Sequence, residues 1–324
     1  RSTQSLIPYK ASRFHASIDS MNATPPSAEF HTLKPWRFAW DWSLAVAPVM
    51  ASITLCERID FRFYPLAILI HGHSFLRLMN LGHEGIHGLL APNRKLNDFL
   101  SRYLCLFPIF VSHSRFKTLH MLHHRFLNDP LDPDYFQFKM FPARLGAWLR
   151  SFTLERLKLR YTRDYVNYFT EIRDRLSKLQ GKRGGLATIR SDFLAFCFFW
   201  TFALTVLALT GLIVPFVIYW ILPAMLTLPW IRMVTALQHG GFPRNHIQSR
   251  SVLGRGLLFR FLFPVHLNFH GEHHLNPGVP HYNLPQFAKF VESSELEPKP
   301  VRVTLHENFG ALFSAPSSAS FPDS

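Results

Sequence analysis

The stretch NFHGEHHLNPGVPHYNLP (residues 268–285) contains three histidines with the spacing HxxHH at 270–274. Two further segments concentrate histidine in the same way, HEGIH at 83–87 and HMLHH at 120–124. On a helix, residues three or four positions apart lie on one face, so each segment would direct two or three imidazole rings toward one point. Neutral imidazole is a ligand for several transition metals, and three such segments in one chain predict a metal centre.

One more histidine can join these segments. His239 ends the last long apolar run and would lie at the same membrane depth as the three segments. Nine imidazoles exceed the coordination sphere of one metal, so we expect two ions, and nitrogen-only ligation suits iron, copper, nickel or zinc. Because long apolar helices lead to the site, we expect a hydrophobic substrate that reacts with oxygen at a di-iron centre. The predicted ligands are His83, His87, His120, His123, His124, His239, His270, His273 and His274.

The composition favours a membrane protein. Of 324 residues, 15% are aromatic and only 17% are charged, while the formal net charge is +14. This basic balance fits either a nucleic-acid-binding protein or a membrane protein with a basic cytoplasmic face, and the apolar runs favour the second, without a nucleic-acid partner. Cys56, Cys105 and Cys197 lie far apart, so they indicate neither a disulfide framework nor a thiolate metal site.

Four apolar segments are candidates for membrane-crossing helices, which need about 20 residues each. The polar turn ERIDFRF joins the first two, and Thr210-Gly211 divides the long apolar run that holds the last two. The predicted fold is therefore all-α, an integral membrane bundle of about four transmembrane helices with a cytosolic, histidine-rich di-iron cap. The predicted crossings are residues 40–56, 64–82, 193–210 and 212–232.

The order of these crossings places every histidine segment on one side of the membrane. The same side holds the Arg- and Lys-rich stretch 143–182, which would lie in the membrane interface or pack on the protein's own core. Positive charge collects on the cytoplasmic side, so we expect the metal centre to face the cytoplasm. We expect a polar tail at 1–36 without the apolar core of a signal peptide, a membrane domain at 37–291 and a Ser/Pro-rich tail at 292–324.

The histidine segments resemble the boxes HxxxH, HxxHH and HxxHH that define the membrane fatty acid desaturase and hydroxylase superfamily. Neighbouring residues are similar to its bacterial-type branch, because Asn97-Asp98 follows the first box, Asp132-Pro133-Asp134 the second and PHYNLP the third. The resemblance covers roughly residues 36–291. In that family a further ligand comes from a histidine after the last crossing, often in a Glu-His-x-Gly setting, whereas here Gln238 precedes His239.

The resemblance implies two iron ions on the cytosolic face, with O2 as co-substrate. One electron pair and one O2 would remove two hydrogens from the acyl chain of a lipid, or would insert oxygen. The alternative is thus a hydroxylase or ketolase of another lipophilic molecule, such as a carotenoid, an alkane or a sterol-like compound. The sequence has no HPGG-type haem motif, so we expect an external electron donor, a ferredoxin or a cytochrome b5-like protein with its reductase. A bacterial inner membrane is favoured over the endoplasmic reticulum.

An alternative from a different class rests on the first segment alone. HEGIH also matches the HExxH motif of zinc proteases, with Glu84 as the general base. A membrane zinc protease would give no role to the second and third segments. A metal transporter would place its histidines along a path inside the bilayer, whereas these histidines collect at one edge of it.

Polar residues beside the ligands are expected to orient the imidazole rings, as carboxylates often do for metal-bound histidine. The candidates for this role are Asp134, Glu84, Gln238 and Asn268. Asp132 has the same option or forms only an Asx-Pro turn. His73 lies about 80° from the helical face of His83, at about 100° per residue. The nearby histidines that we expect not to be ligands are His71, His73, His266 and His281.

Overall fold

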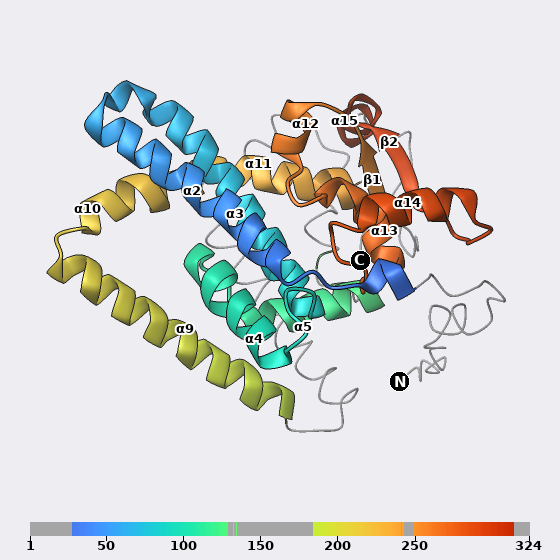
Figure 1. Cartoon of the computed structure of the whole chain (residues 1–324), viewed down its shortest axis with the longest axis horizontal. Helices are drawn as coiled ribbons and strands as arrows, with labels where there is room; N and C mark the ends of the chain where they lie inside the picture. The colour runs from blue at the N-terminus through green and yellow to red at the C-terminus, as the bar shows by residue number, and fades with distance from the viewer. Residues whose placement is uncertain are drawn as a thin grey trace, which may run out of the picture.

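The computed structural model describes residues 28–128, 132, 134, 184–240, 242 and 249–313, and it is predominantly helical. Long helices occupy one end of the molecule, and the short C-terminal elements gather at the other end (Figure 1). The predicted interfacial stretch 143–182 lies outside the described residues.

A pair of long helices forms the centre of the fold. A short 3₁₀ turn, η2 (Phe61–Phe63), joins α2 (Trp36–Arg58) to α3 (Tyr64–His87), and the two helices pack along each other. α3 ends at Gly88, whose φ of 86° is the left-handed conformation that favours glycine after the last turn of a helix. The first histidine segment therefore occupies the final turns of α3.

A close glycine contact fixes α3 against the segment that follows it. α4 (Arg94–Phe99) leads into the π-helical segment η3 (Leu100–Leu106) and the 3₁₀ turn η4 (Phe107–Ile109). η3 packs along α3 at Gly85, where a Cβ atom would lie 2.3 Å from the Cβ of Ser101. Any larger residue would push the two segments apart.

The second long apolar region forms a hairpin. α9 (Gly184–Leu209) is followed by a turn at Gly211, and α10 (Ile213–Phe216), η5 (Val217–Ile221) and α11 (Leu222–His239) then continue as one helical stretch. α11 packs against α3, so the last residue of α11 comes close to the last turns of α3.

Among the described residues, three helical segments are long and apolar enough to cross a membrane, and they agree with three of the predicted crossings. These segments are Trp36–Arg58, Thr188–Leu209 and Ile213–His239. The predicted crossing 64–82 forms part of α3, but polar side chains such as Arg77 lower the hydropathy of this helix. Its role as a fourth crossing therefore stays a prediction.

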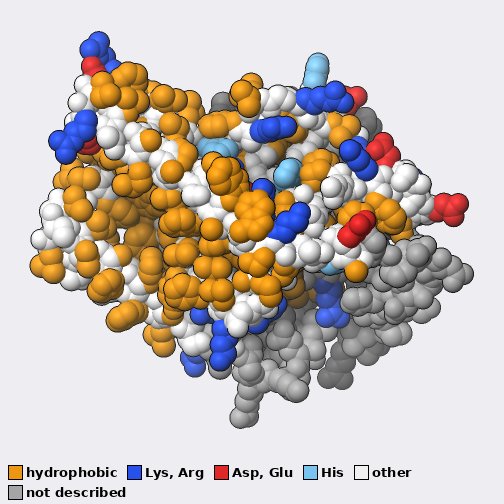
Figure 2. Space-filling view, in the orientation of Figure 1, with side chains coloured by type: hydrophobic (Ala, Val, Ile, Leu, Met, Phe, Trp, Pro, Cys, Tyr) orange, Lys and Arg blue, Asp and Glu red, His pale blue; other side chains and the backbone are white. Residues whose placement is uncertain are grey.

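The surface of the long helices is strongly apolar. On α9, Phe198 is 75% and Leu209 is 83% exposed. Figure 2 shows hydrophobic side chains over most of the half of the molecule that holds the long helices. Exposed apolar surface of this extent is what a bilayer would cover.

The prediction of an all-α fold needs one correction. β1 (Arg250–Leu253) and β2 (Val301–Thr304) form a two-stranded parallel sheet. A parallel pair requires a long crossover connection, and here the crossover carries the third histidine segment. The helices of the crossover are α12 (Leu257–Leu262), η6 (Leu267–Phe269), α13 (His270–Leu275) and α14 (Leu284–Ser293).

The fold also extends past the predicted boundary at residue 291. β2 and α15 (Leu305–Phe313) lie in the segment predicted as a C-terminal tail. Asn308 donates a hydrogen bond to the carbonyl of Leu237 at 2.7 Å and accepts one from Arg250 at 2.9 Å. These contacts join residues 71 and 58 positions apart, which the spacing of residues along the sequence does not reveal.

The N-terminal boundary shifts in the same way. Phe30, in the 3₁₀ turn η1 (Ala28–His31), is buried against Phe287 of α14 with ring centroids 5.5 Å apart. Residues at the end of the predicted N-terminal tail are therefore part of the core that supports the third histidine segment.

Candidate metal centre

The histidine segments occupy the ends of helices that meet at one place. Residues 83–87 end α3, residues 120–124 end α5 (His113–Arg125), and residues 270–274 form most of α13. His239 is the last residue of α11. Spacings of three and four residues align the rings within each helix, and packing of the helix ends brings the segments together.

The nine predicted ligands form two groups, and within each group the ligand nitrogens lie within 4.8 Å of one another. The first group consists of His83, His87, His120, His124 and His273. The second group consists of His123, His239, His270 and His274. Adjacent residues such as His123 and His124 thus serve different groups, because successive side chains on a helix point in different directions.

Some ring nitrogens in each group lie closer to one another than hydrogen bonds between the rings can explain. The Nε2 atom of His120 lies 2.8 Å from the Nε2 atoms of both His83 and His124. In the second group, the Nε2 atoms of His270 and His239 are 2.6 Å apart. A ring nitrogen either donates one proton or offers one lone pair, so the nitrogen of His120 can satisfy only one of its two neighbours. A cation between the rings would accept all of these lone pairs.

Two further observations test whether these residues fit metal ions. The buried Nε2 atom of His87 has no hydrogen-bond partner among the described residues, although buried polar atoms are normally paired. Neutral rings with free lone pairs are the form that binds metal. Burial, reinforced by neighbouring rings, lowers the pKa well below its usual value for His120, His124, His270, His273 and His274. The residues therefore fit a pair of metal ions.

A carboxylate holds one ligand in place. The Nδ1 atom of His123 lies 2.9 Å from Asp132, while the carboxylate of Asp134, the residue named from the sequence, is 3.9 Å away. This contact leaves the Nε2 atom of His123 facing that of His274 at 3.2 Å. Burial lowers the pKa of His123, but the two carboxylates outweigh it and the net pKa is raised. Asp132 is held in turn by the backbone amide of Asn128 at 2.9 Å.

A second carboxylate, which the sequence analysis missed, fixes α13. Glu272 is fully buried, and Arg302 donates to its Oε1 atom from Nε at 2.9 Å and from Nη2 at 2.7 Å. The Ser251 hydroxyl donates to the other oxygen and accepts from the Gly271 amide at 2.9 Å. The sheet thus anchors the third histidine segment. A glutamate placed between ligands in HGEHH was the available signal.

The other residues expected to orient the rings make backbone contacts. Glu84 accepts a hydrogen bond from the amide of His281 at 2.9 Å. Gln238 donates to the carbonyl of Leu267 at 2.7 Å, and Asn268 donates to a carbonyl of β1 at 3.3 Å. These contacts tie α3 and α11 to the chain around α13, and so they hold the helices that carry the ligands.

The nearby histidines occupy other positions. His71 contacts the Ser52 hydroxyl at 3.1 Å, and His73 contacts the carbonyl of Phe261 at 2.8 Å. Neither belongs to either ligand group.

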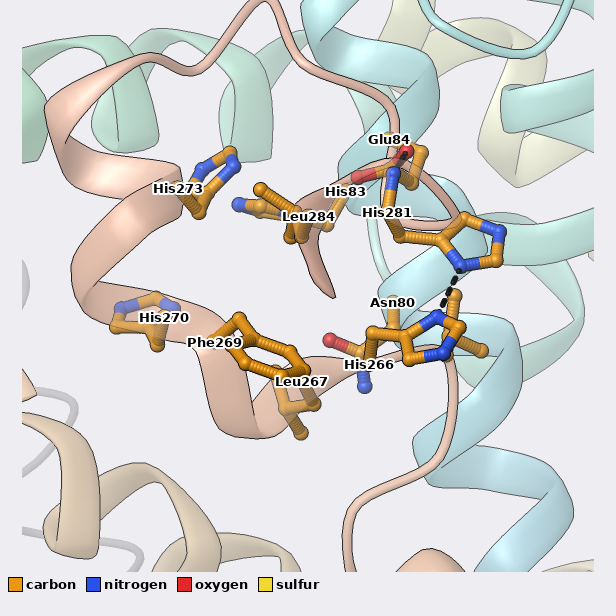
Figure 3. Close-up of a pocket in the computed structure, with 11 residues that line it drawn as sticks. Asn80, His83, Glu84, His266, Leu267, Phe269, His270, His273, His281 and Leu284 are labelled. Carbon is orange, nitrogen blue, oxygen red and sulfur yellow. Dashed lines mark hydrogen bonds between the residues drawn. The ribbon is translucent and has the colours of Figure 1, made fainter. Parts of the chain in front are cut away.

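In the described part of the chain, two cavities reach the predicted ligands. The smaller, of about 20 Å³, has the ligands His83, His270 and His273 in its wall. Its other polar wall residues are Asn80, Glu84, His266 and His281. In Figure 3, His266 and His281 face each other on one side of this cavity, and His270 and His273 lie on the other side.

The larger cavity, of about 410 Å³, reaches ligands of both groups. Much of its wall is apolar, with side chains from α3, α5 and α11. The apolar residues that these three helices contribute are Leu76, Met79, Phe116, Leu119 and Ile231. Arg115 and Arg232 also line it. A cavity of this size that combines apolar side chains with polar groups is typical of a small-molecule site.

The fold and the site define a predominantly helical protein with apolar helices long enough to span a membrane and nine clustered histidines. The family model of the fatty acid desaturases matches residues 61–304. The chain therefore belongs to the fatty acid desaturase family, which confirms the resemblance seen in the histidine boxes. Family membership and the three apolar helices make it a membrane oxidoreductase of a family that uses iron.

Similar proteins are desaturases by name. The chain is 29% identical to dihydrorhizobitoxine desaturase of Bradyrhizobium elkanii, over 78% of this chain and 73% of that protein. It is 24% identical to a probable fatty acid desaturase of Sorghum bicolor, over 84% of this chain and 74% of that protein. It is 23% identical to the sn-1 acyl-lipid omega-3 desaturase (ferredoxin) of a Synechocystis species, over 71% of this chain and 67% of that protein.

Proposed function

We propose that the protein is a di-iron desaturase that uses O2 to introduce a double bond into the acyl chain of a lipid. The observation that carries the proposal is the gathering of nine histidines in two groups beside a largely apolar cavity of about 410 Å³. When bound, the two irons would supply the oxidising chemistry with O2 that side chains alone do not provide.

The two histidine groups would hold one ion each. Five nitrogens surround the first position and four surround the second. Histidine donors suit iron and do not suit magnesium or calcium, which prefer oxygen ligands. Asp132 and Glu272 keep the rings in position from outside the ligand groups, because each holds a ligand or its helix by hydrogen bonds of 2.9 Å or less.

The larger cavity supports a long apolar substrate. Its apolar side chains would pack along the methylene groups of an acyl chain and exclude water from them. His83 and His270 belong to different ligand groups and both line this cavity, so a chain inside it would pass both metal positions. The two adjacent carbons of the acyl chain that lie beside His83 and His270 would be those from which hydrogen is removed.

The comparisons favour desaturation over the alternatives. The relatives described above are desaturases by name, which favours hydrogen removal over the oxygen insertion of a hydroxylase or ketolase. The zinc protease is disfavoured because His83 and His87 share one group with three further histidines, whereas a catalytic zinc site keeps an open position beside about three protein ligands.

The electron donor is inferred to be a separate protein. The name of the Synechocystis relative includes ferredoxin, which supports a one-electron carrier of the ferredoxin or cytochrome type for this chain. The excess of positive charge on the side predicted to hold the centre supports a cytoplasmic active site, where such carriers are reduced.

Metal analysis of the detergent-purified protein tests the proposal. We expect two irons per chain, and double bonds in lipids supplied with O2 and a reductant. His273→Ala should lose iron and activity, whereas His73→Ala, outside both groups, should keep its iron. One zinc per chain without iron, or iron without any oxidised lipid product, would overturn the proposal.

A further inference from the structure

A line of polar side chains leads from the small cavity away from the ligands (Figure 3). The Nδ1 atoms of His266 and His281 lie 3.4 Å apart, and both rings line the cavity. On its far side, the Nε2 atom of His281 lies 3.2 Å from the Oδ2 atom of Asp41. His281 is buried, and His266 is partly exposed. Of these three titratable groups, His266 and His281 line the cavity, and His266 also reaches the surface.

The backbone at His266 is held in an uncommon conformation. Val265 and His266 have φ values of 57° and 51°, in the left-handed region that residues other than glycine rarely adopt. Such backbone persists only where the surrounding structure imposes it, and it often marks a functional position. Here it brings the imidazole of His266 to the wall of the cavity beside that of His281.

The surroundings suit the two rings to proton transfer. Arg77 lies 3.0 Å and Arg37 lies 3.4 Å from the carboxylate of Asp41, and both balance its negative charge. Asp41 in turn would orient the ring of His281 from its Nε2 side, as a carboxylate does beside a catalytic histidine. Burial and the neighbouring His281 lower the pKa of His266 to about 4, so this ring is neutral at rest and passes a proton on quickly.

The proposed reaction needs a path that supplies protons to the metal centre. Each desaturation takes two hydrogen atoms from the substrate, two electrons from the donor and two protons from solvent, and reduces one O2 to two waters. A substrate in the larger cavity would exclude water from that side of the ligands. The smaller cavity shares the ligands His83 and His270 with the larger one, and its volume of about 20 Å³ is enough for roughly one water molecule.

We propose that His281 and His266, with one water in the small cavity, deliver solvent protons to the metal centre during O2 reduction. This inference rests on the proposed function. In each transfer His266 gives its Nδ1 proton to the Nδ1 atom of His281, and His281 gives that proton to the cavity water, which passes one of its own protons to reduced oxygen. The lost proton is replaced from solvent at the partly exposed His266.

The test compares His281→Gln and His266→Gln with the matched control His71→Gln, another buried histidine that lies outside the cavity. We expect all three variants to keep two irons per chain. The first two should turn over about 100-fold more slowly, the usual effect of losing a general acid, with a larger solvent isotope effect in D2O. The control should stay within about two-fold of the wild type.

A second readout needs no turnover. In the ¹⁵N spectrum of zinc-loaded protein with labelled histidine, we expect His266→Gln to shift the ring signals of His281, and Asp41→Asn to do the same. Unchanged signals, wild-type turnover in His281→Gln, or slower turnover with an unchanged isotope effect would each overturn the relay. A wild-type protein that binds iron but consumes no O2 would instead show that the proposed function fails, before any variant is compared.

Discussion

The imidazole of His123 donates its Nδ1 proton to the carboxylate of Asp132 across 2.9 Å, and its Nε2 atom is thereby left for the metal position. A carboxylate in this position fixes both the orientation and the protonated nitrogen of a ligand ring. Asp134 lies 3.9 Å from the same nitrogen and is partly exposed. The two aspartates follow the same histidine segment but differ in what they hold.

We predict that Asp132→Asn weakens iron binding by about 10- to 100-fold, because an amide is a poorer acceptor for the ring N–H. Asp134→Asn should change iron affinity by less than about 3-fold, since its longer contact contributes little. Iron retention against a graded series of chelator concentrations measures both. If the two variants lose iron affinity equally, Asp132 is not the residue that orients His123.

The ion pair of Arg302 with Glu272 predicts a structural role for the C-terminal segment. Arg302→Gln would leave the fully buried Glu272 carboxylate without its cation. Because Arg302 is 22% exposed, we expect destabilisation toward the lower end of the ~3–5 kcal/mol typical of breaking a buried pair. The unfolding midpoint and the iron content should fall together.

A surface arginine provides the control for that variant. Arg62 pairs with Asp60 at 2.7 Å, but its side chain is 92% exposed. Arg62→Gln should leave the midpoint and the iron content unchanged. If Arg302→Gln behaves like Arg62→Gln, the sheet does not anchor the third histidine segment.

The sequence predicted which histidines would come together, because helical spacing aligns the rings within each segment. Packing of the helix ends then combines the eight histidines of the three segments with His239 into the two groups. The anchor of α13 could not be predicted, because Ser251 and Arg302 are about fifty residues apart and meet through strand pairing. The choice between Asp132 and Asp134 depends on the conformation of one loop, which residue spacing does not determine.

Close packing of α3 yields a prediction about the first histidine segment. Gly85→Ala places a Cβ atom 2.3 Å from the Cβ of Ser101, so α3 and η3 must separate. The shift would displace His83 and His87, which flank Gly85, and we expect lower iron content and a lower unfolding midpoint. Overpacking of this kind costs about 1–3 kcal/mol.

A second glycine provides the control for this variant. It shows whether the effect comes from the close contact or from replacing glycine by alanine in a helix. Gly310→Ala on α15 puts its Cβ where no atom lies within 4 Å, and alanine is the better helix former by about 1 kcal/mol. This variant should be as stable as the wild type or more so, with its iron retained. Iron loss in both variants would show that the contact with Ser101 is not what matters.

The histidine pKa values predict how the stability of the metal-free protein depends on pH. Five ligands outside the spanning helices have pKa values well below the ordinary 6.5, so the unfolded chain binds more protons than the folded one as pH falls below 6.5. Stability is therefore complete above that pH and is lost progressively below it. His123, whose pKa is raised, acts in the opposite direction above pH 6.5 but is one group against five.

We expect the unfolding midpoint of iron-free protein to drop between pH 7.5 and 5.5, and to drop less in His273→Gln, which removes one of the five. A midpoint that is flat or rises over this interval would mean that the rings are not buried as neutral groups.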